Sequence, residues 1–157
     1  MKMRNRILLA VCLLSLLTLH VAEGGQTTFT LYKDYIVPVP AENYVVFCAR
    51  AFGPDKYVVL DLKQKEARIY SPYQEKGLLY THRMTDAEYE KATTLLTSDQ
   101  MQNIPERNDK LALDAFEFSA HGIVKGKTLK FHHILPDNKA VLDLYDLYKH
   151  FRDTIPR

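Results

Sequence analysis

The stretch FEFSAHGIVKGKTLKFHH, residues 116–133, holds three of the chain's six histidines around a Lys-Gly-Lys turn. A two-residue type I′ turn at Lys125–Gly126 pairs Val124 with Lys127, because glycine tolerates the positive φ that this turn needs. Side chains alternate between the two faces of a strand, so a loop longer by two residues would leave the faces unchanged. The stretch therefore predicts a β-hairpin whose faces can be assigned residue by residue.

One face of this hairpin is apolar and the other is polar. The apolar face carries Phe116, Phe118, Ala120, Val124, Leu129, Phe131, His133 and Leu135. The polar face carries Glu117, Ser119, His121, Ile123, Thr128, Lys130, His132 and Ile134. We expect His133 to be a core or rim histidine with one hydrogen bond. His121 and His132 are expected on the outer face, diagonal with the tight turn and directly opposite with the longer loop.

The polar face is the predicted binding surface, and five of its residues are the candidates: Glu117, Ser119, His121, Lys130 and His132. The alternative is a metal site of Glu117, His121 and His132, because imidazole and carboxylate suit zinc and related ions. Nothing local adds a fourth ligand, and no catalytic residue is assigned because no nucleophile accompanies the histidines. The ordinary interpretation is a solvated or partner-covered sheet face.

Two other surfaces remain open as alternatives. Tyr70, Pro72 and Tyr73 lie close together in the sequence, and tyrosines are common anchors at binding surfaces. Tyrosines also fill pleated sheets, so packing is the simpler interpretation of them. A basic tip on the hairpin, formed by Lys125, Lys127 and Lys130, is more typical of a soluble edge that resists pairing with another sheet.

Two helices are predicted. Thr85 and Glu88 form a capping box ahead of an apolar stripe, which predicts a helix at about 86–97. A second helix at about 138–153 is predicted by apolar residues at helical spacing, with Asp137 as its expected N-cap. Those apolar residues are Val141, Leu144, Tyr145, Tyr148, Phe151 and Ile155.

The front half of the chain predicts an antiparallel meander of five short strands. They are placed at about 28–37, 43–51, 56–62, 66–71 and 78–83, with Pro38 and Pro40 ending the first. Residues 99–110 are expected to be a connection that tucks Met101 and Ile104 under the domain. The predicted fold class is α+β: an antiparallel β-meander or sheet with both helices packed on one face.

Residues 1–24 have the order of a secretory signal peptide. Lys2, Arg4 and Arg6 precede an apolar run at 7–19, and Ala22 and Gly24 are the small residues of a cleavage site. The run is short for a transmembrane helix, so no stable span is expected after cleavage, although an uncleaved anchor is the alternative. We therefore expect one exported domain, residues 25–157, in a periplasm or secreted.

Charge and cysteine content narrow the function. The full chain has 21 Lys and Arg and 19 Asp and Glu; the signal segment holds three of the cations and one of the anions, so the mature chain is neutral. This balance does not favour a nucleic-acid partner. Cys48 is then the single cysteine and is expected to be a buried thiol. No phosphate loop, nucleophile elbow or zincin motif is present, and no cofactor is predicted.

The predicted function is a small exported non-enzymatic binding, accessory or inhibitor-like protein. Its partner is expected to be a protein in the cell envelope or outside the cell. The alternative is a metal-binding protein or a metal-dependent hydrolase that uses Glu117, His121 and His132. The oligomeric state is left open.

Overall fold

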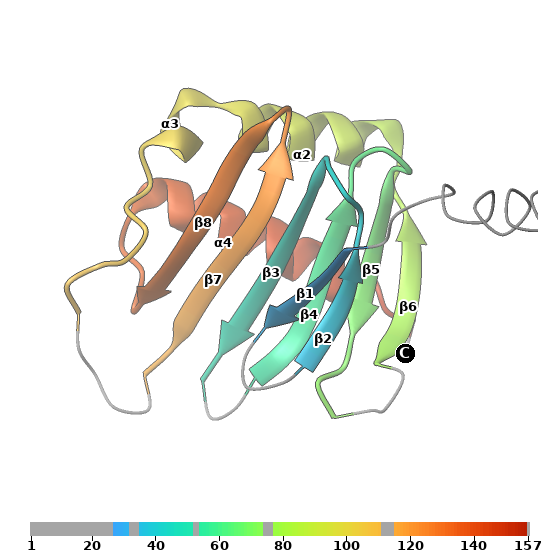
Figure 1. Ribbon diagram of the computed structural model, residues 1–157, viewed down its shortest axis with the longest axis horizontal. Helices are drawn as coiled ribbons and strands as arrows, with labels where there is room; N and C mark the ends of the chain where they lie inside the picture. The colour runs from blue at the N-terminus through green and yellow to red at the C-terminus, as the bar shows by residue number, and fades with distance from the viewer. Residues whose placement is uncertain (1–26, 32–34, 52–53, 74–76, 111–114, 157) are drawn as a thin grey trace, which may run out of the picture.

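The computed structural model describes residues 27–31, 35–51, 54–73, 77–110 and 115–156. A six-stranded sheet stands at its centre, with the strand order β6-β5-β4-β3-β7-β8 and every pair antiparallel (Figure 1). Its strands are β3 (Tyr44–Arg50), β4 (Pro54–Asp61), β5 (Glu66–Tyr70), β6 (Leu78–Arg83), β7 (Glu117–Val124) and β8 (Lys127–Ile134). The predicted signal segment, residues 1–24, lies outside the described residues.

Three helices lie on one face of this sheet (Figure 1): α2 (Asp86–Thr97), the short α3 (Asp99–Gln102) and α4 (Lys139–Arg152). Strands β3 to β6 follow one another as a meander, after which the helical segment leads to β7 beside β3. This arrangement confirms the predicted α+β class, with the antiparallel sheet and both predicted helices. Met101 is buried and Ile104 packs against the same core, as predicted for the connection.

The core between sheet and helices is rich in rings. Phe118 of β7 is fully buried, and its ring centroid lies 5.9 Å from that of Phe47, 5.2 Å from that of Tyr145 and 5.7 Å from that of Tyr148. Tyr145 and Tyr148 both come from α4, so the apolar stripe predicted for the last helix is the surface that closes this core.

The capping of the two long helices is part confirmed and part corrected. Thr85 and Glu88 form the predicted capping box at the start of α2. The N-cap of α4 is Asn138 rather than Asp137: its Oδ1 accepts from the backbone N–H of Ala140 at 2.9 Å. The Asp137 carboxylate, one residue ahead of the N-cap, pairs instead with the Lys110 ammonium at 2.9 Å.

The β7–β8 hairpin has the register that the tight turn predicts, with Val124 opposite Lys127. Lys125 has φ 49° and Gly126 has φ 75°, as a type I′ turn requires. The inward face is buried as predicted apart from Phe116, which is partly buried, and His133 Nε2 makes one hydrogen bond to the Pro105 carbonyl at 2.7 Å. Leu135 departs from the prediction: it follows the strand with φ 45° and is 47% exposed, so it does not join the apolar face.

The opposite face of the sheet carries a second, two-stranded sheet of β1 (Thr27–Leu31) and β2 (Tyr35–Val39) (Figure 1). The prediction of one opening strand at 28–37 is therefore wrong, because β1 and β2 are separate strands that pair antiparallel with each other. Pro38 lies inside β2, which is an edge strand of the two-stranded sheet, and edge strands tolerate a residue without an N–H. Val37 and Val39 pack on the larger sheet, in a cluster with Tyr44, Val46, Cys48, Tyr57, Val59 and Tyr70.

The edge strand β8 is partly covered by the segment before β7. The His132 backbone N–H donates to the Glu106 carbonyl at 2.7 Å, and the Asn108 side chain bonds both the N–H and the C=O of Ile134. This contact protects one end of a strand edge that would otherwise be open to pairing with another chain. Within the described ranges, no helix has the length and apolar character needed to span a membrane.

Candidate functional site: the outer face of the β7–β8 hairpin

The sheet face opposite the helices has a covered part and an open part. β1 and β2 lie over the middle of the sheet (Figure 1), where Val37 and Val39 of β2 pack with buried side chains of β3, β4 and β5. Over β7 and β8 the side chains are polar and partly exposed. We call this open part the hairpin face and define it by Arg50 together with the predicted residues Glu117, Ser119, His121, Lys130 and His132.

Glu117 lies at one end of the hairpin face, between Arg50 and His132. It stands opposite Arg50 of β3, and the distance from its Oε2 to the Arg50 guanidinium nitrogen is 3.9 Å. The same oxygen lies 3.5 Å from His132 Nε2, across the diagonal to β8. The Glu117 side chain is 21% exposed and that of His132 45%. This partly buried carboxylate therefore has a cation and an imidazole beside it, both farther away than in a charge-assisted hydrogen bond.

The other end of the hairpin face is occupied by His121 and Lys130, which stand opposite each other in the register. Burial lowers the pKa of His121 below its usual value, and the Lys130 ammonium lowers it further. The His121 imidazole is thus held in its neutral form at neutral pH, with its ring 6.4 Å from that of Tyr44. Lys130 forms an ion pair with Glu106 at 2.5 Å.

Ser119 lies between these two ends, opposite Cys48 on one side and His132 on the other. Its hydroxyl donates to the Cys48 carbonyl at 3.5 Å, a long hydrogen bond. Cys48 itself is buried, as predicted, and is a free cysteine in the described part of the chain. Burial raises the pKa of its thiol to about 12, so the reactive thiolate is not formed at neutral pH.

The residues of the predicted metal alternative are brought together in part. His132 is beside Glu117, whereas His121 lies beside Tyr44 and opposite Lys130, in the diagonal relation that the tight turn predicts. A cation next to an imidazole opposes binding of a second cation there. In the described part of the chain, no group of three or more His, Cys, Asp or Glu side chains could hold a metal ion.

The alternative surface around Tyr70, Pro72 and Tyr73 is divided by the structure. Tyr70 is buried under β2, where it is a packing residue. Tyr73 is 75% exposed and lines a hollow of about 370 Å³ together with Arg50, Phe116, Tyr145 and others. This hollow adjoins the Arg50 end of the hairpin face, so the two predicted surfaces are neighbours.

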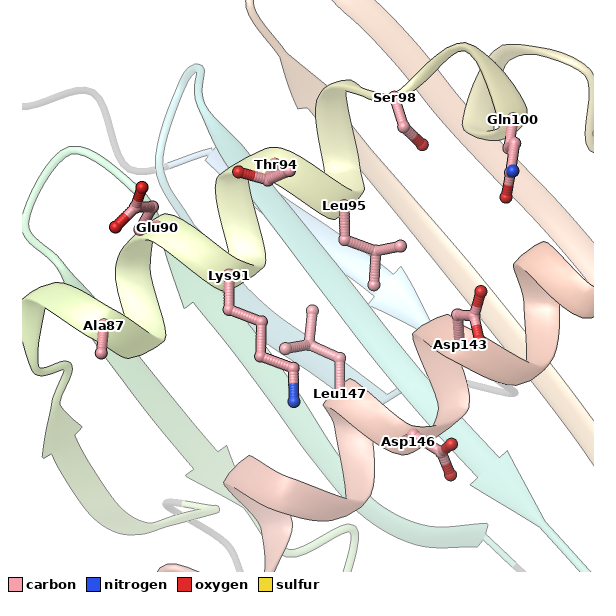
Figure 2. A pocket seen from close by; sticks show the side chains of 10 residues that line it. All are labelled: Ala87, Glu90, Lys91, Thr94, Leu95, Ser98, Gln100, Asp143, Asp146 and Leu147. Carbon is pink, nitrogen blue, oxygen red and sulfur yellow. The ribbon is translucent and has the colours of Figure 1, made fainter.

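A groove of about 670 Å³ lies between α2 and α4 (Figure 2). Leu95 of α2 and Leu147 of α4 face one another across it, and Lys91 reaches toward α4. Its two α4 carboxylates are already paired within the helix, Asp143 with Lys139 at 2.7 Å and Asp146 with Lys149 at 2.7 Å. The groove therefore offers an apolar floor beside two α4 carboxylates that already have lysine partners, and Glu90 of α2 is a third acidic residue in its lining.

A second ionisable cluster joins three elements on the helix side, and the sequence did not reveal it. The Glu88 carboxylate accepts hydrogen bonds from His82 of β6 at 3.0 Å and from His150 of α4 at 2.7 Å, besides those from Thr85. Burial alone would raise the pKa of Glu88, but these hydrogen bonds lower it to about 2. The capping box identified Glu88 alone, because the two histidines lie 6 and 62 residues away.

Arg50 and Glu106 are members of the hairpin face and its border that sequence reasoning also missed. Their positions depend on which strands pair, not on any local pattern. Comparison with models of known protein families gave no match, and comparison with curated proteins gave none either.

Proposed function

We propose that the protein is a small exported, non-enzymatic binding or accessory protein that recognises a protein partner through the hairpin face. The observation that carries the proposal is the position of Glu117 on the open part of the outer face. Its two neighbours, Arg50 at 3.9 Å and His132 at 3.5 Å, are too distant for strong hydrogen bonds. A guanidinium or ammonium group of a partner would complete the hydrogen bonding of this carboxylate.

The surroundings of Glu117 fit a contact surface. Ile123 and Ile134 are partly buried at the two ends of the hairpin face, and Tyr73 and Phe116 line the adjoining hollow. Tyrosine and arginine are frequent among the residues that dominate binding energy at interfaces. Export is supported by the sequence of residues 1–24, which would place the partner in a periplasm or outside the cell.

The test is a crosslinking pull-down from native envelope and culture fluid, with residues 25–157 as bait. The site variant is Glu117→Ala/His121→Ala/His132→Ala. The matched control is Lys91→Ala/Asp143→Ala/Asp146→Ala, which removes three polar groups from the groove of Figure 2. We expect one partner to be captured by the wild type and by the control but not by the site variant. Capture by all three baits, or by none, would contradict the proposal.

The same variants separate this proposal from the metal alternative. A ligand that binds only the folded state raises the melting temperature. We expect stoichiometric zinc, nickel or copper to leave the melting temperature unchanged. A rise that is lost in both His121→Ala and His132→Ala would replace the binding-protein proposal with a metal site on the same face.

A further inference from the structure

A cavity of about 310 Å³ lies where the β7–β8 turn meets the α2–α3 junction. Figure 1 shows the turn reaching the layer of these two helices. The apolar walls of the cavity come from four residues that are largely buried: Leu96, Met101, Val124 and Leu129. This volume is at the lower end of the range for small-molecule sites, and its apolar walls are typical of them.

Two lysines stand at this cavity. Lys127 is opposite Val124 in the register and therefore shares the helix-side face with it. Lys125 precedes Gly126 in the turn, and its backbone N–H donates to the Asn43 side chain at 3.0 Å. The type I′ turn and this hydrogen bond fix the backbone that carries both lysines. The predicted basic tip is therefore divided, because Lys130 faces the other side and pairs with Glu106.

The charge at the cavity is one-sided. Lys125 and Lys127 are exposed, and neither forms an ion pair with any described residue. No acidic side chain is among the described residues that line the cavity. The groove between α2 and α4 differs, because its lining includes three acidic residues and one lysine. Two unpaired cations beside an apolar cavity fit a ligand that is apolar along its length and anionic at one end.

We infer that this cavity is a binding site for a single-chain carboxylate amphiphile, with the alkyl chain among Leu96, Met101, Val124 and Leu129 and the carboxylate at Lys125 and Lys127. The site is on the helix side of the sheet, so it is separate from the hairpin face and does not depend on the function proposed for that face. Each methylene buried by the cavity strengthens binding by about fourfold, until the chain fills the available length.

The experiment is calorimetric titration of the full chain with saturated linear carboxylates of six to twelve carbons, each below its micelle concentration. The alkylammonium of equal length is the matched probe of opposite charge. We expect affinity to increase with chain length for the carboxylates and to be at least tenfold weaker for the alkylammonium. In the variant Lys125→Glu/Lys127→Glu this preference should invert.

The inversion of charge preference distinguishes binding at this cavity from binding at other apolar parts of the chain. Residues 7–19 are apolar as well, but binding there would not respond to substitutions at Lys125 and Lys127. Equal affinity for both probes, an unchanged preference in the variant, or no binding of any carboxylate would overturn the inference. Vesicles of anionic phospholipid should bind no better than neutral ones, and stronger binding that depends on the two lysines would assign them to a membrane surface instead.

Discussion

The two faces of the six-stranded sheet are covered in different ways. On the helix side, α2 and α4 close a core of aliphatic and aromatic side chains, with Phe118 at its centre. On the outer side, the two-stranded sheet of β1 and β2 lies over the middle of the larger sheet (Figure 1), and Val37 and Val39 of β2 pack in a smaller cluster that includes three tyrosines. The helix side has the features of a structural core. The outer side has the smaller cluster and ends at the polar hairpin face, which is the surface that we propose for a protein partner.

Phe118→Ala should have the largest effect on stability. The ring is fully buried among Phe47, Tyr145 and Tyr148, so its removal leaves a cavity in the helix-side core. We expect a loss of about 3–5 kcal/mol in the free energy of unfolding, measured by urea denaturation. Ser119→Ala, the next residue on the opposite face, should change it by less than about 0.5 kcal/mol. Similar losses of unfolding free energy in the two variants would mean that the two faces of β7 contribute equally to stability.

Val39→Ala and Val141→Ala form a matched pair, one on each side of the sheet. Both valines are buried, with 1% and 0% exposure, so each substitution should lower the free energy of unfolding by about 2 kcal/mol. The variants should differ in the rate at which a thiol reagent labels Cys48, which lies in the outer cluster with Val39. With a pKa of about 12, Cys48 has almost no thiolate at pH 8, and labelling requires the cover to open.

We expect faster labelling of Cys48 in Val39→Ala than in Val141→Ala, because a weakened β2 would open without unfolding the rest of the sheet. The unfolded protein in urea supplies the reference rate. Equal labelling rates at equal loss of stability would show that the two sides open together, and the outer cover would then be part of one cooperative unit.

Glu88→Gln should lower the free energy of unfolding by roughly 1–2 kcal/mol at pH 7, because the carboxylate joins α2 to both β6 and α4 by charge-assisted hydrogen bonds. Its pKa is lowered from 4.5 to about 2 in the folded protein. The stabilisation by Glu88 is therefore complete above about pH 4.5 and is lost as the pH falls toward 2.

The measurement is urea denaturation of wild type and Glu88→Gln at several pH values between 7 and 2. The difference in the free energy of unfolding between them should narrow below about pH 4.5. Glu90→Gln, an exposed position on the same helix, is the control and should stay within about 0.5 kcal/mol of wild type at pH 7. A difference that persists unchanged at pH 2 would show that the ionised Glu88 carboxylate does not stabilise the fold.

The features that the sequence predicts correctly are those with local signals. The Lys125–Gly126 turn determines the register of β7 and β8, and this register places Phe118 inside and Glu117 outside. Thr85 and Glu88 mark the start of α2 in the same way. Each of these signals depends on residues within a few positions of one another, where backbone geometry leaves few choices.

The features that the sequence misses depend on long-range pairing. β7 pairs with β3, which brings Arg50 to Glu117 across 67 positions of the chain, and no local pattern indicates this partner. The division of 28–37 into β1 and β2 was missed because residues 32–34 include no glycine or proline to signal a turn. The pairing of β7 with β3 and that of β1 with β2 together determine which part of the outer face is covered, and hence the extent of the hairpin face.

Asn138→Ala should have the smallest effect, and it tests the corrected start of α4. The Asn138 side chain accepts from Ala140 at 2.9 Å and from Val141 at 3.3 Å, and removal of an N-cap costs about 1 kcal/mol. Asp137→Ala, at the position that the sequence favoured, removes only an exposed pair with Lys110 and should leave the urea midpoint nearly unchanged. The reverse order of effects would place the cap at Asp137. α4 supplies Tyr145 and Tyr148 to the helix-side core. The loss of unfolding free energy in Asn138→Ala therefore also measures how much the N-terminal end of α4 contributes to the stability of that core.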